Sequence, residues 1–150
     1  MSTSSLWKII ATLGFVGYLP FAPGTFGSFA AMVFVILVKP SATAHVVLLL
    51  LITFVGTIAS HHAEIVLKEK DSGHIVIDEF AGYVLSVLFL PASFPYFFAA
   101  FLLFRVFDIL KPPPIRWIEG VLPGGIAVMA DDLVAGICTN ALLQIWIVLA

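Results

Sequence analysis

The 150-residue chain is too apolar and carries too few charges to be a soluble globular domain. Hydrophobic residues make up 61% of it and charged residues 11%, against about a quarter charged in a typical soluble domain. Its mean hydropathy is +1.14 and its net charge is −2. A soluble particle of this size needs a polar shell that these side chains cannot supply, and a disordered chain or a basic nucleic-acid-binding surface is also excluded. We therefore expect one integral-membrane domain over residues 1–150, with the lipid bilayer as its partner and no nucleic acid.

The single cysteine and the first apolar segment set two further limits. Cys138 stands alone, so an intrachain disulfide and a cysteine-based metal cluster are excluded. The apolar stretch after Lys8 contains Gly14, Gly17 and Pro20 and lacks a small-x-small cleavage site. We expect it to stay in the mature chain rather than to act as a signal peptide.

The charge-free intervals predict an all-α, polytopic membrane bundle. An interfacial amphipathic segment is expected over residues 6–19, because a Pro-Gly pair follows it. Five short transmembrane helices are expected after it, at residues 25–38, 44–61, 75–90, 94–110 and 126–149. Two of these spans carry acids near one end, and for them the alternative is a re-entrant or half-buried helix.

The basic residues predict the orientation of this bundle. With five spans, six of the seven Lys and Arg residues lie on or near one side of the membrane, and only Lys39 lies on the other. Because basic residues favour the cytoplasmic side, the N-terminus is expected there and the C-terminus on the external side. All nine acids then fall on or just below the cytoplasmic face.

Five acidic residues near the cytoplasmic ends of three spans are the main candidates for chemistry: Asp78, Glu79, Asp108, Asp131 and Asp132. Ionised carboxylates at membrane depth are costly and usually mark function. Arg105 and Lys111 compensate part of their charge, and a divalent cation is the natural remaining partner. Oxygen ligands without cysteine favour Mg²⁺, or Mn²⁺ as a substitute, over zinc. The alternative is interhelical salt bridging without a metal, which the surplus of acids over bases disfavours.

Two repeated spacings predict where the helices meet. Asp78 and Gly82 are four residues apart, as are Asp132 and Gly136, so each pair shares a helix face. A glycine one turn from an acid lets a neighbouring helix approach closely. We expect the third and fifth spans to touch at these positions.

Two further motifs lie on the same side of the membrane. Gly24, Thr25 and Ser28 follow a proline at the start of the first span, where free N–H groups and hydroxyls are suited to an anion; an ordinary turn with an N-cap is the alternative. Glu64, at the end of the second span, is either a further metal ligand or a solvated helix-end acid.

Together these motifs resemble a known family. Four blocks resemble, in order, the hallmark blocks of the phosphatidylglycerophosphatase A family: PFAPGTFGS, KDSGHIVIDEFAGYV, FRVFDILKPPPIRW and GGIAVMADDLVAG. They extend over residues 20–136, and four blocks in register are far more specific than any one of them.

The resemblance implies a Mg²⁺-dependent lipid phosphatase of the bacterial inner (cytoplasmic) membrane. Its reaction would convert phosphatidylglycerophosphate to phosphatidylglycerol and phosphate at the cytoplasmic face. The matching positions carry over to Asp78, Glu79, Arg105, Asp108, Lys111, Asp131, Asp132, Gly24, Thr25 and Ser28.

From these residues we form a working hypothesis for the site. One or two Mg²⁺ ions are held by carboxylates, with Glu64 as a further candidate beside Asp78, Glu79, Asp131 and Asp132. Arg105, Lys111 and the backbone amides of residues 24–28 neutralise the phosphate. Asp108 either orients one of these cations or acts as a base. The choice between a metal-activated water and an aspartyl-phosphate stays open, as does the oligomeric state. A small acid-lined transporter is the rival function, and it predicts acids spread across the depth of the membrane.

Overall fold

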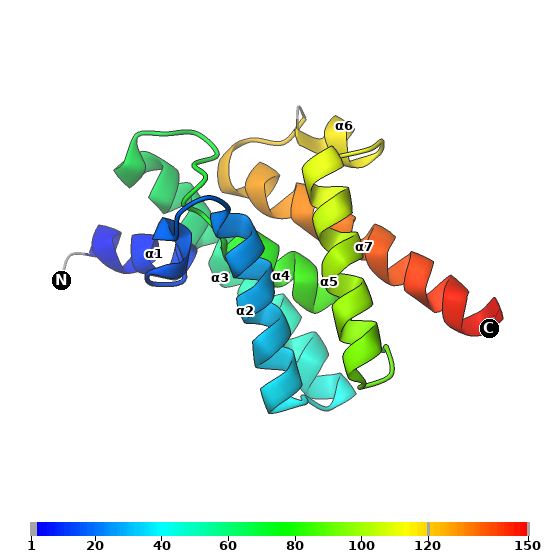
Figure 1. Ribbon diagram of the computed structural model, residues 1–150. Helices are drawn as coiled ribbons and strands as arrows, with labels where there is room; N and C mark the ends of the chain where they lie inside the picture. Colours follow the sequence, from blue (N-terminus) through cyan, green and yellow to red (C-terminus); the bar gives the residue numbers. More distant parts are fainter. Residues whose placement is uncertain (1–2, 120, 150) are drawn as a thin grey trace.

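The structure, a computed structural model, describes residues 3–119 and 121–149, and these residues form helices and no strand (Figure 1). This confirms the predicted all-α class. In chain order the elements are α1 (Thr3–Ala11), the 3₁₀ turn η1 (Val16–Tyr18), α2 (Pro23–Val38), α3 (Ala42–Leu67), α4 (Ile77–Ser86), α5 (Phe94–Leu110), α6 (Ile115–Glu119) and α7 (Gly124–Leu149).

Several helix boundaries agree with the sequence prediction to within two residues, but α3 ends at Leu67 rather than at residue 61, and the third expected span differs more. α5 begins and ends where predicted, and α2 and α7 begin two residues early. The third expected span, 75–90, is much shorter because α4 ends at Ser86 and the chain then turns, with Phe89 at φ 61°. The expected first segment also divides: α1 stops at Ala11, and Gly14 at φ 68° redirects the chain. The predicted extent of the third span, 75–90, was therefore wrong, whereas the interfacial character expected for residues 6–19 stays a prediction.

Helix lengths bear on the number of spans. Within the described part of the chain, two helices are long and apolar enough to cross a membrane, Ala42–Leu67 and Gly124–Leu149. α2 and α5 have 16 and 17 residues, or about 24–26 Å at 1.5 Å per residue, against a hydrocarbon core of about 30 Å. α4, with ten residues, extends only about 15 Å. Five full spans thus stay a prediction, and α4 has the length of the half-buried alternative.

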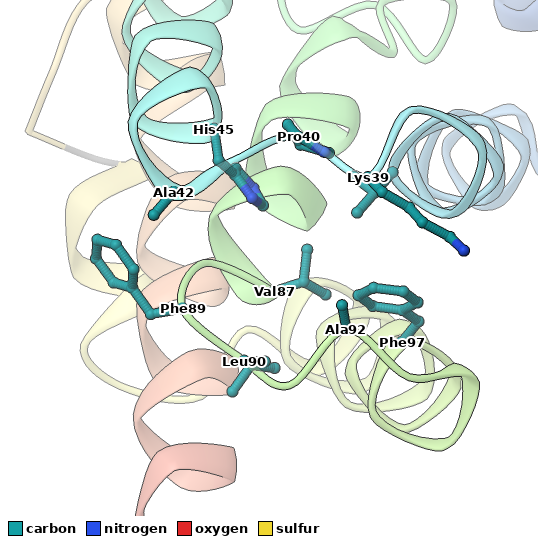
Figure 2. A pocket seen from close by; sticks show the side chains of 10 residues that line it. Lys39, Pro40, Ala42, His45, Val87, Phe89, Leu90, Ala92 and Phe97 are labelled. Atoms are coloured by element: carbon teal, nitrogen blue, oxygen red, sulfur yellow. The ribbon is translucent and has the colours of Figure 1, made fainter.

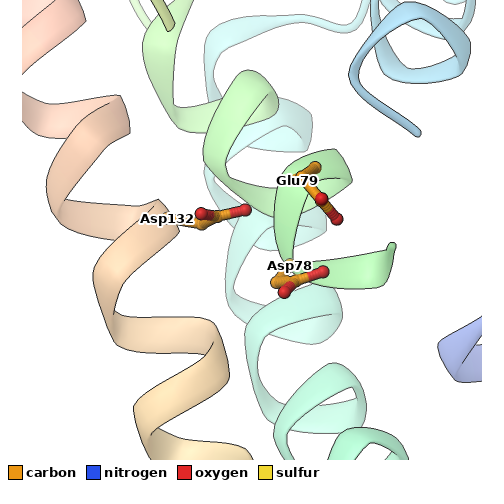
Figure 3. Close-up of side chains that lie close together, drawn as sticks. All are labelled: Asp78, Glu79 and Asp132. Atoms are coloured by element: carbon orange, nitrogen blue, oxygen red, sulfur yellow. The ribbon is translucent and has the colours of Figure 1, made fainter. Parts of the chain in front are cut away.

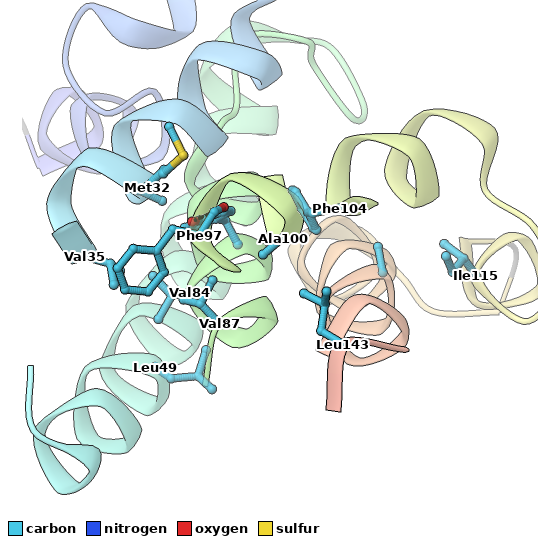
Figure 4. Packing of buried hydrophobic residues seen from close by; sticks show 13 residues of the cluster. Met32, Val35, Leu49, Val84, Val87, Phe97, Ala100, Phe104, Ile115 and Leu143 are labelled. Atoms are coloured by element: carbon cyan, nitrogen blue, oxygen red, sulfur yellow. Dashed lines mark hydrogen bonds between the residues drawn. The ribbon is translucent and has the colours of Figure 1, made fainter. Parts of the chain in front are cut away.

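α4 lies at the centre of the molecule, in contact with α2, α3, α5 and α7 (Figure 1). Tyr83 and Val84, on its second turn, are fully buried. They belong to one hydrophobic core with Phe104 of α5, which is also fully buried (Figure 4). Many large apolar side chains of α3 and α7 face outward. Such outward apolar faces suit a lipid environment.

The most extensive helix contact among the described residues joins α4 to α7. A Cβ atom on Gly82 would lie 2.7 Å from the Asp132 carbonyl oxygen, and one on Gly136 would lie 2.5 Å from the Gly82 carbonyl oxygen. No larger residue fits either position without moving a backbone. The predicted contact between the third and fifth spans is therefore confirmed, at the glycines that predicted it.

At the end of α4 that is remote from its acids, two connections lie side by side. The α2–α3 connection, with Lys39, faces the α4–α5 connection, with Leu90, across a cavity of about 140 Å³ (Figure 2). His45 from the first turns of α3 lies in the wall of this cavity, and its side chain is buried. The molecule thus has an acidic end, where α4 begins, and a mainly apolar end, where α4 stops.

Candidate active site

Three carboxylates converge where the first turn of α4 faces α7. Asp78, Glu79 and Asp132 each offer an oxygen within 4.8 Å of the others (Figure 3). Asp78 and Asp132 are buried, with 8% and 3% of their surface exposed, and Glu79 is half-buried. One buried oxygen of each lacks a hydrogen-bond partner among the described residues: Asp78 Oδ1, Glu79 Oε2 and Asp132 Oδ2. Buried polar atoms are nearly always paired, so this group of carboxylates is suited to holding a cation.

The local sequence explains why two of these acids open α4. Ile75 and Val76 are buried before the helix, and the Val76 N–H donates to the Ala11 carbonyl (2.9 Å). This bond ties the start of α4 to the end of α1. Asp78 and Glu79 then fall in the first helical turn, where the helix dipole favours negative charge.

The two consecutive aspartates of α7 face different neighbours. Asp132 turns toward α4, whereas Asp131 accepts a hydrogen bond from Lys111 Nζ (2.6 Å). Successive helical residues lie about 100° apart around the axis, so the pair reaches both α4 and the end of α5. Asp131 is therefore held beside the three-carboxylate group rather than within it.

Arg105 and Asp108 line the same space from α5. The Arg105 guanidinium donates from Nη1 to Asp108 Oδ2 (2.5 Å) and more weakly to Ser28 Oγ (3.4 Å). Its buried Nε has no partner in the described part of the chain. Asp108 is also an electrostatic neighbour of both Glu79 and Asp132. The structure thus places all five predicted acids and both predicted cations together.

The start of α2 closes this space. A Cβ atom on Gly24 would overlap Glu79 Oε1 and would lie 3.3 Å from Arg105 Nη1. Ser28 is buried and donates its hydroxyl to the Gly24 carbonyl (2.9 Å), while Thr25 is half-buried. The glycine is required for close approach, so the predicted anion-binding turn does lie against the carboxylates.

Glu64 is not among the three carboxylates that converge. Its Oε1 accepts the Asp71 backbone N–H (2.8 Å), an arrangement that holds the α3–α4 connection. Three acids, Glu64, Asp71 and Asp131, line a cavity of about 210 Å³. Lys70 also lines it and was not among the predicted site residues; its place beside Asp71 in the KDSGH run was the available signal. The ligand roles of Glu64 and Asp131 stay predictions.

Comparison with known proteins decides the family. A family model described as phosphatidylglycerophosphatase A matches residues 9–147. The chain belongs to the phosphatidylglycerophosphatase A family. The resemblance inferred from the four sequence blocks is thereby confirmed. A comparison with solved structures finds no match.

Relatives across bacteria support this assignment. The chain is 34% identical over 146 residues to phosphatidylglycerophosphatase A of Escherichia coli (strain K12), covering 95% of this chain and 84% of that protein. It is 35% identical over 119 residues to phosphatidylglycerophosphatase A of Haemophilus influenzae, covering 77% and 73%. It is also 33% identical over 160 aligned positions, covering 99% of both chains, to a Bacteroides thetaiotaomicron protein whose name proposes a phosphatidylinositol-3-phosphatase.

Proposed function

We propose that this protein hydrolyses the terminal phosphate monoester of phosphatidylglycerophosphate, releasing phosphatidylglycerol and phosphate. The observation that carries the proposal is the group formed by Asp78, Glu79 and Asp132, with three buried unpartnered oxygens. Family membership supports the substrate, since two relatives bear the name of this activity. Acids gathered at one end of the molecule disfavour the transporter, which needs them along the membrane depth.

A divalent cation, Mg²⁺ or in its place Mn²⁺, would be held by this group. Hard cations of this kind bind carboxylate oxygens, and three clustered carboxylates, two of them buried, need positive charge to remain ionised together. Asp131 and Glu64 are the further candidate ligands. When bound, such an ion polarises the phosphate and makes a coordinated water easier to deprotonate.

The chain's own cations would bind the phosphate. Arg105 is oriented by Asp108, and its buried Nε–H is an unused donor on the edge of the acidic group. A guanidinium held in this way matches phosphate oxygens with paired hydrogen bonds. Lys111, positioned by Asp131, and the first amides of α2 would bind other phosphate oxygens. For Asp108, the short bond to Arg105 favours the orienting role over that of a base.

We place the protein in the bacterial inner membrane, with this end of the molecule at the cytoplasmic face. The two long apolar helices and the outward apolar side chains support a membrane location. The Lys and Arg distribution supports the orientation, with α2, α4 and α5 as shorter membrane-embedded helices. The lipid's acyl chains would stay in the bilayer while its head group reaches the acids.

The decisive experiment replaces single carboxylates with their amides. Asp78→Asn and Asp132→Asn keep side-chain size and remove one charge, and each should lower phosphate release from phosphatidylglycerophosphate micelles by about 100-fold or more. Glu69→Gln is the matched control, because Glu69 is exposed and accepts only a Ser72 hydroxyl bond that glutamine can also accept. Near-normal release by both aspartate variants, with the purified proteins folded, would overturn the proposal.

A further inference from the structure

The end of α4 remote from its acids is held by side chains from two other helices. An α-helix leaves its last four carbonyls without intrahelical partners, and the chain after Ser86 turns rather than continuing the helix. His45 Nε2, from α3, donates to the Val84 carbonyl (2.9 Å). Asn140 Nδ2, from α7, donates to the carbonyls of Ser86 (3.1 Å) and Leu88 (2.8 Å). Both amide hydrogens of Asn140 are thus used on the same turn of chain.

These bonds lie among apolar residues of α4 and α7. Val84 and Val87 are buried, as is Leu143 one turn beyond Asn140. A backbone carbonyl without a partner in such surroundings is strongly disfavoured. The positions of His45 and Asn140 therefore determine where α4 can stop.

The bonds also belong to a regular alignment of α4 with α7. Asp132 faces Asp78, Gly136 packs on Gly82, and Asn140 bonds Ser86, each pair separated by 54 residues in the chain. Since each step is four residues, about one helical turn, the two helices run parallel in one register. The acids occupy the first turn of this contact, the glycines the second and the amide the third.

We propose that Asn140 and His45 are positioning residues for the three-carboxylate group. Asn140 fixes the axial register of α4 against α7, and His45 fixes the same end of α4 against α3. A slip of α4 along α7 would break the three bonds from His45 and Asn140 and a longer one from Gln144 Nε2 to the Leu88 carbonyl (3.4 Å), and it would separate Asp78 from Asp132. The glycine contact restricts sliding sterically, because no larger residue fits at Gly82 or Gly136, and the polar bonds add a directional constraint on the register. This inference rests on the proposed metal site at the three carboxylates.

The test measures Mn²⁺ binding by the detergent-solubilised full chain, read from the loss of the free-ion EPR signal, together with kcat and KM. Asn140→Leu and His45→Leu remove the donors and should each weaken Mn²⁺ binding by about 10-fold or more and lower kcat, while KM for the lipid changes less than 3-fold. His45→Gln and Asn140→Gln each retain an N–H donor at the position and should recover most of the Mn²⁺ binding. Ser86→Ala is the matched control: its buried hydroxyl donates to the Gly82 carbonyl within α4 (2.8 Å), so Mn²⁺ binding should stay within 2-fold of wild type.

The outcomes separate this inference from the proposed function. If the wild-type chain binds no Mn²⁺, the proposed metal site fails. If the wild type binds Mn²⁺ and both leucine variants bind it as tightly as the wild type does, only the positioning role is overturned. It is also overturned if Ser86→Ala loses as much binding as they do, since general loosening would then suffice. If a leucine variant cannot be recovered folded, the two glutamine variants provide the test. Glutamine variants that fold but bind Mn²⁺ no better than Asp78→Asn would contradict the proposal that hydrogen-bond donors at these positions fix the register.

Discussion

The two ends of α4 use polar groups in opposite ways. At its C-terminal end the carbonyls of Val84, Ser86 and Leu88 all receive hydrogen bonds from neighbouring helices. At its N-terminal end, ten residues away, Asp78 and Glu79 are brought against Asp132 with buried oxygens unpartnered. Satisfied polar groups at one end make the helix rigid, and unsatisfied ones at the other are available to a ligand. The end of α4 that is held by hydrogen bonds thus supports the end that carries the acids.

The largest expected effect comes from removing divalent metal, which should affect only the N-terminal end of α4. Dialysis against a chelator should reduce phosphate release to background, because the clustered carboxylates then repel one another and the substrate phosphate. Adding Mg²⁺ or Mn²⁺ should restore it. Phosphate release would be followed colorimetrically at each added ion concentration. Full activity in the chelated protein would show that the unpartnered oxygens have another purpose.

A methyl group at Gly24 should have the next largest effect. Gly24→Ala places a Cβ where Glu79 Oε1 lies, so the carboxylate must turn away from the cluster. We expect kcat to fall by about 10- to 100-fold, comparable to the loss of one strong polar contact, with the thermal midpoint nearly unchanged. Gly73→Ala is the control, because nothing lies within 4 Å of its Cβ position. Equal activities of the two variants would argue against a Glu79 role.

Replacing Arg105 with lysine should have a moderate effect on substrate binding. Arg105→Lys keeps the charge and removes the planar fork, including the unpartnered Nε–H. We expect kcat/KM to fall by about 10-fold. Arg116→Lys, at an exposed position of α6, should leave steady-state kinetics on the lipid substrate unaltered. An unchanged kcat/KM for Arg105→Lys would mean that charge alone is needed there.

The smallest effect is expected in the middle of α4, where a satisfied bond has no link to the acids. Tyr83 is fully buried and donates its hydroxyl to the Phe97 carbonyl (2.9 Å). Tyr83→Phe should cost about 1 kcal/mol, lowering the thermal midpoint in detergent by about 2–4 °C, with kcat within 2-fold. Tyr96→Phe, half-buried at the edge of the fold, provides the comparison. A large kcat loss in Tyr83→Phe would show that this hydrogen bond is coupled to the acids at the N-terminal end of α4.

Sequence patterns predicted the helices best where breakers and charges bound them. Proline and lysine delimit α5, and both of its ends agree with the prediction. α4 was predicted too long because its last residues are as apolar as a continuing helix. Its stop depends on His45 and Asn140, which lie 39 and 54 residues away in the chain. Periodicity within one segment cannot contain that information.

By itself, the sequence determined the membrane-suited composition, the helical class, the family and the set of acids and cations at one end. These properties follow from residue identities and short spacings, because they depend on interactions between residues close together in the chain. Only the tertiary structure decided that Asp132 rather than Asp131 joins Asp78 and Glu79, and that Glu64 holds a loop. Neighbouring residues on a helix face different directions. Which direction meets another helix is set by its register, and that register depends on contacts between residues far apart in the chain.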